Sequence, residues 1–69
     1  MNKYAIYQVD DIGNHLVVAQ INSSNAKCAI KSFQKRLTSA GIYEVHKIKY
    51  GTWELSSSYG GYWYTEKIT

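Results

Sequence analysis

One segment of the chain, residues 26–40, repeats its apolar side chains with the period of an α-helix. These side chains fall at positions i, i+3, i+4, i+7, i+11 and i+14: Ala26, Ala29, Ile30, Phe33, Leu37 and Ala40. The spacing places them on one face, which predicts an amphipathic helix of about four turns. Ser23 or Ser24 is the expected N-cap residue, and Gly41 stands where a helix-ending glycine belongs. A helix with one apolar face requires a second layer to cover that face.

Five segments around this helix are rich in aromatic and β-branched residues and predict the strands of that layer. Two precede the helix, at 4–9 and 15–21, and three follow it, at 43–50, 52–56 and 62–68. The short connection between the first two makes them an antiparallel hairpin. A change of apolar phase between Val45 and Ile48 indicates a bulge. The sequence therefore predicts an α+β fold, an antiparallel sheet of about five strands in the order β-β-α-β-β-β with the helix packed on one face.

The chain has 69 residues and one cysteine, and both facts restrict its class. The length predicts one domain, residues 1–69, and a single Cys28 excludes a disulfide within the chain. Cys28, His15 and His46 show no metal-ligand spacing, so we expect no metal and no cofactor. An unpaired thiol suits a reducing cytoplasm, and no apolar run approaches the roughly 20 residues of a membrane-spanning helix. We therefore expect a cytoplasmic protein that does not contact a membrane.

Catalysis finds little support in the sequence. Asp10 and Asp11 are adjacent carboxylates, but they lie in a predicted turn, where both are common turn residues. Cys28 lies near the predicted start of the helix, but a cysteine nucleophile needs a base beside it, and neither histidine is placed by the sequence to serve. Since no glycine-rich phosphate loop is present either, we expect a protein without enzymatic activity.

The net charge of +3 is unevenly distributed along the chain. Residues 24–50 hold six basic side chains and one acidic side chain, whereas the rest of the chain holds two basic and four acidic ones. Lys27, Lys31 and Lys35 are spaced i, i+4 and i+8 on the predicted helix, with Arg36 at their end; we call these four residues the basic stripe. Like charges at this spacing repel each other. A binding site for nucleic acid or an acidic protein surface would explain the basic stripe, and so would an ordinary solvated helix face.

Aromatic residues near the end of the chain exceed what one side of a small sheet can bury. If Trp63 faces the helix, strand alternation turns Tyr62 and Tyr64 to the other side. Exposed tyrosines suit protein interfaces and, beside basic residues, stacking on bases. Cross-strand aromatic pairing that stiffens the sheet is the alternative interpretation.

The arrangement of these features resembles the small phage-encoded anti-CRISPR proteins, and within them an inhibitor of type I-F systems of about this length. The resemblance extends over most of the chain and is one of pattern. It is carried by four segments: Tyr4-Ala5-Ile6-Tyr7-Gln8-Val9 in the first strand, Ala26-Lys27 at the start of the helix, Gly51-Thr52-Trp53-Glu54-Leu55 in the fourth strand and Gly61-Tyr62-Trp63 at the start of the fifth.

The resemblance implies a protein that binds the backbone subunits of an RNA-guided type I surveillance complex and blocks hybridisation or recruitment of target DNA. It implies a contact surface of basic and polar helix residues, which by position are Lys31, Gln34, Lys35 and Arg36. We add Lys27, Tyr62 and Tyr64 as candidate partner-binding residues and expect a monomer or a weak dimer. Two other hypotheses stay open: a small nucleic-acid-binding module that contacts DNA or RNA with the basic stripe, Tyr62 and Tyr64, and a small dimerisation protein that uses its outward aromatic residues.

Overall fold

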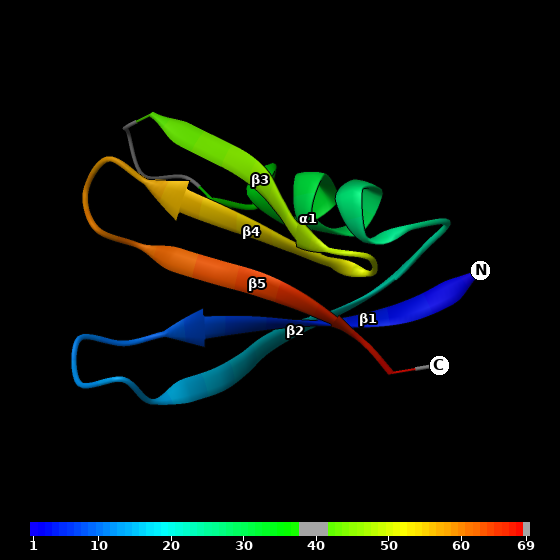
Figure 1. Ribbon diagram of the computed structural model, residues 1–69, viewed down its shortest axis with the longest axis horizontal. Coiled ribbons are helices and arrows are strands. Elements are labelled where there is room, and N and C mark those ends of the chain that lie inside the picture. Colours follow the sequence, from blue (N-terminus) through cyan, green and yellow to red (C-terminus); the bar gives the residue numbers. More distant parts are fainter. Residues whose placement is uncertain (38–41, 69) are drawn as a thin grey trace.

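Five strands form one antiparallel sheet in the computed structural model, which describes residues 1–37 and 42–68. The elements along the chain are β1 (Asn2–Val9), β2 (His15–Ser23), α1 (Ala26–Gln34), β3 (Tyr43–Lys49), β4 (Thr52–Ser57) and β5 (Tyr62–Lys67). The strands lie in the order β2-β1-β5-β4-β3, and every neighbouring pair is antiparallel (Figure 1). The predicted α+β fold and the element order β-β-α-β-β-β are therefore confirmed.

Helix α1 connects the two outer strands of the sheet, β2 and β3, and lies on one face of it (Figure 1). Its buried residues are Ala26, Ala29, Ile30 and Phe33, which are the apolar positions that the sequence predicted over these turns. They pack against Tyr4, Ile6, Ile21, Leu55 and Trp63 of the sheet. Small alanines in the first turn let the helix approach the sheet closely, while Ile30 and Phe33 fill the space farther along.

Both ends of the helix differ from the prediction. The N-cap residue is Asn25, whose side-chain Oδ1 accepts a hydrogen bond from the Cys28 N–H at 2.8 Å. The expected caps are wrong because β2 extends through Ser23, which is buried, and the helix starts at Ala26. At the other end, tighter hydrogen bonds from Arg36 N to Phe33 O and from Leu37 N to Gln34 O follow the last helical residue.

Helix α1 is shorter than predicted, because it ends at Gln34 with Lys35 as its C-cap residue. Leu37 nevertheless packs against the core, half-buried, from the segment beyond the helix. The apolar spacing of the sequence therefore continues to Leu37, past the helix end, because Leu37 also contacts the core. Ala40 and Gly41, expected to complete and end the helix, lie outside the described residues.

The sheet contains two irregularities and one buried hydroxyl. The register of β3 against β4 shifts between Lys47 and Lys49, next to the predicted bulge, and that of β1 against β2 shifts between Ile6 and Tyr7. Thr65 of β5 is fully buried, and its Oγ1 accepts a hydrogen bond from the Trp53 N–H at 3.0 Å. This hydroxyl satisfies a backbone donor just beyond the last paired residues of β4 and β5, where an apolar side chain would leave it unpaired.

The opposite face of the sheet carries no helix within the described residues, and we call it the uncovered face. Side chains alternate between the two faces along a strand, so Trp63 and Thr65 point toward α1 while Tyr62, Tyr64 and Glu66 lie on the uncovered face. The turn of the β1–β2 hairpin projects away from the helix (Figure 1). Apolar side chains near it are correspondingly exposed: Ile12, Leu16, Val17 and Val18.

Candidate functional site

The basic stripe lies on the exposed side of α1 and continues past its end. Lys27 and Lys31 belong to the helix, Lys35 is its C-cap residue and Arg36 follows; all four are exposed, and Gln34 is half-buried. Within residues 1–37 and 42–68 no member of the stripe is ion-paired, since the ion pair found there joins His46 to Glu44. The charges of the stripe are therefore not neutralised by any described carboxylate.

The helix dipole acts differently on the two ends of the stripe. Lys31 lies in the last turn, and the partial negative charge of a helix C-terminus stabilises a cation there by about 0.3–1 kcal/mol. Lys27 lies in the first turn, which holds no acidic residue, and there the dipole disfavours a positive charge. Its Nζ lies 5.4 Å from the ring centroid of Trp53 on β4, in a cation–π contact. Helix stability thus accounts for Lys31, but it does not account for Lys27.

The fold separates charges of opposite sign between the two sides of the sheet. On the helix side lie six of the eight basic residues: Lys27, Lys31, Lys35, Arg36, Lys47 and Lys67. Glu44, Glu54 and Glu66 lie on the uncovered face, in register with Ser56, Tyr64 and Ala5 of neighbouring strands. The remaining carboxylates, Asp10 and Asp11, belong to the β1–β2 turn. The helix side is therefore basic, and the described residues place no carboxylate on it.

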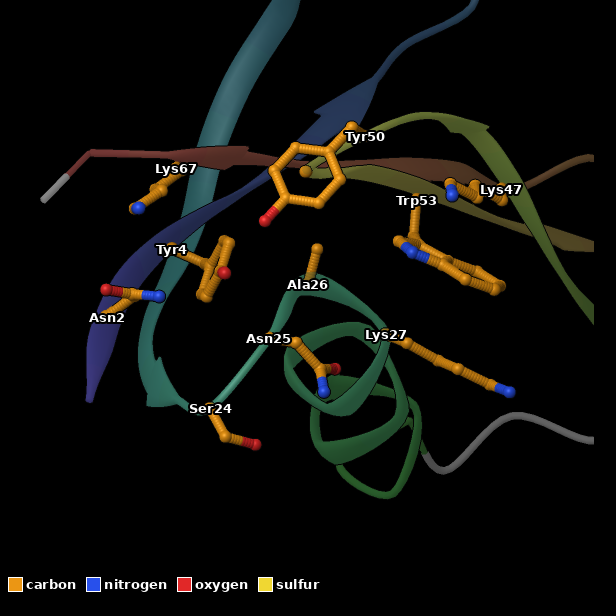
Figure 2. A pocket seen from close by; sticks show the side chains of 11 residues that line it. Asn2, Tyr4, Ser24, Asn25, Ala26, Lys27, Lys47, Tyr50, Trp53 and Lys67 are labelled. Atoms are coloured by element: carbon orange, nitrogen blue, oxygen red, sulfur yellow. The ribbon is translucent and has the colours of Figure 1, made fainter.

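A hollow of about 290 Å³ opens on the helix side, where the start of α1 meets the sheet (Figure 2). We call it the helix-end pocket. Its three lysines come from different elements, Lys27 from α1, Lys47 from β3 and Lys67 from β5. Figure 2 shows the ring of Tyr50 and that of Trp53 beside the hollow, with Ala26 below Tyr50. The pocket thus combines three cations with aromatic rings.

The turn between β3 and β4 places Tyr50 at the rim of this pocket. Gly51 follows it with φ +83°, a left-handed conformation that residues with a Cβ adopt only with strain. Tyr50 is 95% exposed, although it is a large aromatic side chain. Packing within the domain does not explain why this tight turn holds an exposed ring next to three lysines.

Tyr62 and Tyr64 do not join the basic stripe. Trp63 between them is buried against α1, with its ring 6.0 Å from that of Phe33, so its two neighbours lie on the uncovered face. The predicted alternation is therefore correct, but the sheet separates these two tyrosines from the lysines of the helix. One partner surface cannot include both sets without contacting both sides of the domain.

The tyrosines of the uncovered face form a cluster across β1 and β5. The rings of Tyr7 and Tyr64 stack with centroids 5.1 Å apart, and Tyr62 lies 6.3 Å from Tyr64. Nδ1 of His15 lies 2.6 Å from the Tyr64 hydroxyl. The structural interpretation of these residues, cross-strand pairing that stiffens the sheet, thus matches the Tyr7–Tyr64 contact.

Two of these phenols are held in the neutral form. Burial, and then a hydrogen bond to the Glu54 carboxylate, raise the pKa of Tyr62 to about 12. Burial, and then the charge of Glu66, raise the pKa of Tyr64. Because the folded pKa of each lies above the ordinary value near 10, their contribution to stability is present below that pH and is lost as the pH rises through the folded pKa.

The ionisation of Tyr62 can be followed by tyrosinate absorbance. We expect it to appear as the difference between the absorbance titration of the unmodified protein and that of Tyr62→Phe. This difference should titrate at about pH 12. In Glu54→Gln it should titrate at lower pH, because the negative charge beside the phenol is gone, but still above the ordinary pKa, because burial remains. A difference that titrates near pH 10 with Glu54 in place would contradict the contact.

The described residues do not bring together a catalytic or metal-binding group. Within them, no cluster of three or more His, Cys, Asp or Glu side chains could hold a metal ion. The Asp10 carboxylate accepts hydrogen bonds from the Asn14 and Ile12 N–H groups, which lower its pKa and mark it as a turn residue. Cys28 is exposed. The absence of enzymatic activity stays a prediction. The described residues offer no arrangement that favours catalysis.

The sequence interpretation missed most of the helix-end pocket. It selected Lys27 but missed four other residues, which lie far from Lys27 along the chain: Lys47, Tyr50 and Trp53 of the β3–β4 hairpin and Lys67 of β5. The signal available in the sequence was the aromatic residue on each side of the predicted turn, Tyr50 and Trp53, next to a lysine-rich strand. Pairing of β4 with β5, and of β5 with β1, brings Lys67 to the same place.

No helix among the described residues is long and apolar enough to cross a membrane. Comparison of the chain with protein-family models, curated proteins and solved structures found no match to any of them.

Proposed function

We propose that this protein is a non-enzymatic inhibitor that docks the basic stripe on a type I CRISPR surveillance complex in the host cytoplasm and blocks hybridisation or recruitment of target DNA. The identity of the partner comes from the resemblance in sequence pattern. The use of the helix side comes from the charge distribution of the fold.

The separation of charge is the observation that carries the binding part. Six basic side chains share the helix side, and none of the described carboxylates lies there to neutralise them. Like charges on one surface repel each other, so a partner of opposite charge would relieve that repulsion and speed association. A positively charged groove of the surveillance complex, of the kind that holds target DNA, would repel the helix side. Acidic side chains of the backbone subunits, or guide-RNA phosphates exposed between them, are therefore the expected contacts.

A capture experiment with matched charge reversals tests this proposal. Tagged protein should retain a purified type I surveillance complex, and Lys31→Glu/Lys35→Glu should reduce the retained amount at least tenfold. The control Lys3→Glu/Lys49→Glu changes the net charge equally but leaves the stripe intact, so it should retain the complex. Circular dichroism would verify that both variants fold.

The results separate the two parts. Absence of capture by the unmodified protein would reject the partner, whereas equal capture by both variants would reject the basic stripe as the contact. A target-DNA binding assay on the captured complex then tests whether occupancy blocks hybridisation.

A small nucleic-acid-binding module is the second candidate, favoured by the lysines and exposed aromatic ring that meet at the helix-end pocket. A module that binds nucleic acid through the helix-end pocket would not use Tyr62 and Tyr64, because both lie on the uncovered face. It predicts a shift of free DNA or RNA in a gel, with affinity that falls steeply as salt increases. The inhibitor predicts capture of the complex without such a shift.

A further inference from the structure

We propose that the helix-end pocket binds one nucleotide unit, with its phosphate held by lysine side chains of the pocket wall and its base against the ring of Tyr50. The inference deepens the second candidate, nucleic-acid binding at this pocket, and does not depend on the inhibitor function, since the pocket lies within this chain and needs no surveillance complex. The ligand is defined by its chemistry, an aromatic base joined to a phosphate. Its source is a free mononucleotide or the end of a single strand.

The charge of the pocket favours an anion. Three different elements contribute one lysine each, and the residues that line the pocket include no aspartate or glutamate. None of the three lysines is ion-paired within the described parts of the chain. The pocket lies at the start of α1, whose first turn holds no acidic residue, so the positive end of the helix dipole adds to the lysine charges. Figure 2 shows Lys67 on one side of the pocket and Lys27 and Lys47 on the other. A phosphate on either side would therefore meet lysine donors that can form charge-assisted hydrogen bonds with it.

The rings of the pocket favour a flat, unsaturated group beside that anion. The Tyr50 side chain is 95% exposed, so a base can stack on it without displacing any protein contact. Trp53 is half-buried and already engaged by Lys27 at 5.4 Å, which fixes one wall of the pocket. Stacking of a base on an aromatic side chain contributes to binding without requiring a particular base. We therefore expect weak discrimination among the four bases.

The size and the polar groups of the pocket suit one nucleotide unit. Its volume of about 290 Å³ lies near the lower limit of small-molecule pockets, about 300 Å³. Asn2, Ser24 and Asn25 line it together with the lysines and can form hydrogen bonds with a sugar or a phosphate. The cap of α1 uses only the Oδ1 of Asn25, so this bond does not occupy its amide N–H donors.

Titration of the purified protein followed by NMR tests this inference. The probes are adenosine monophosphate, adenosine, inorganic phosphate and a short single-stranded oligoadenylate with a 5′-phosphate. Adenosine monophosphate should shift the backbone amides of Ala26 and Lys27 in a saturable manner, and adenosine or phosphate alone should bind at least tenfold more weakly. Lys47→Gln/Lys67→Gln and Tyr50→Ala should each weaken binding of adenosine monophosphate at least fivefold. The control Lys31→Gln/Lys35→Gln removes the same charge from the stripe and should change it less than twofold.

Each result has a defined meaning. Equal affinity for adenosine monophosphate and the oligonucleotide would support the site with a free nucleotide as its source, and tighter binding of the oligonucleotide that still depends on Lys47, Lys67 and Tyr50 would support a strand end. Loss of affinity in the stripe control as large as in Lys47→Gln/Lys67→Gln would overturn the inference in favour of diffuse attraction to a basic surface. The absence of saturable shifts with any of the four probes would also overturn it.

Discussion

Replacement of Phe33 by alanine is expected to remove a large part of the protein's stability, so that the variant unfolds at a much lower urea concentration. Truncation of a buried phenylalanine costs about 3–5 kcal/mol, whereas a chain of this length has a total stability of roughly 3–10 kcal/mol at about 0.05–0.15 kcal/mol per residue. Phe33 is buried, and it is the helix residue whose ring lies 6.0 Å from that of Trp63. Its removal would open a cavity between the helix and the centre of the sheet.

Urea unfolding followed by far-ultraviolet circular dichroism measures this effect. Ser32→Ala is the matched control, because Ser32 is the exposed neighbour on the same helix and its truncation should change stability by less than about 0.5 kcal/mol. If Phe33→Ala unfolds at the same urea concentration as the unmodified protein, the contact between α1 and β5 does not hold the two layers together.

Gly61→Ala is expected to destabilise the protein by about 1–3 kcal/mol, a typical cost of overpacking. A Cβ at this position would contact Cη2 of the Trp63 ring and lie 2.8 Å from its Cζ3. Trp63 cannot withdraw easily, because its ring is buried and lies beside those of Phe33 and Tyr43. The glycine is therefore required by the indole two residues farther along the strand.

A double-mutant cycle isolates this clash. The Trp63→Phe background lacks the indole atoms that the added Cβ would contact, so Gly61→Ala should cost only about a few tenths of a kcal/mol there. Chemical denaturation of the four proteins gives the coupling energy. An equal cost in both backgrounds would show that the backbone at residue 61, rather than the indole, disfavours alanine.

Local periodicity predicted most of the architecture. The apolar positions from Ala26 to Phe33 form the buried face of α1, and five strand-like segments became five strands. Alternation also predicted that Tyr62 and Tyr64 lie on the face opposite Trp63, although it did not decide which face Trp63 occupies. These features depend on the side chains of one segment and on its period, which the sequence displays directly.

The errors arose where neighbouring segments decide the outcome. Ser23, Ser24 and Asn25 are all capping residues, and the length of β2 determines which of them caps the helix. The order of the strands depends on pairing between the first and the last strand, which no local pattern records. The helix-end pocket was missed for the same reason, because Lys47 and Lys67 come to line one pocket only after the sheet has formed.

The position of β5 between β1 and β4 also bears on how the protein acquires its structure during synthesis. The β1–β2 and β3–β4 hairpins involve neighbouring segments and can form early, but they share no pairing with each other. Of the five strands, β5 is the last to leave the ribosome, and until it inserts, β1 and β4 each present an open edge to other chains. Joining the hairpins requires contacts between distant segments, which slows folding. Aggregation during expression should therefore depend on how quickly this last strand finds its place.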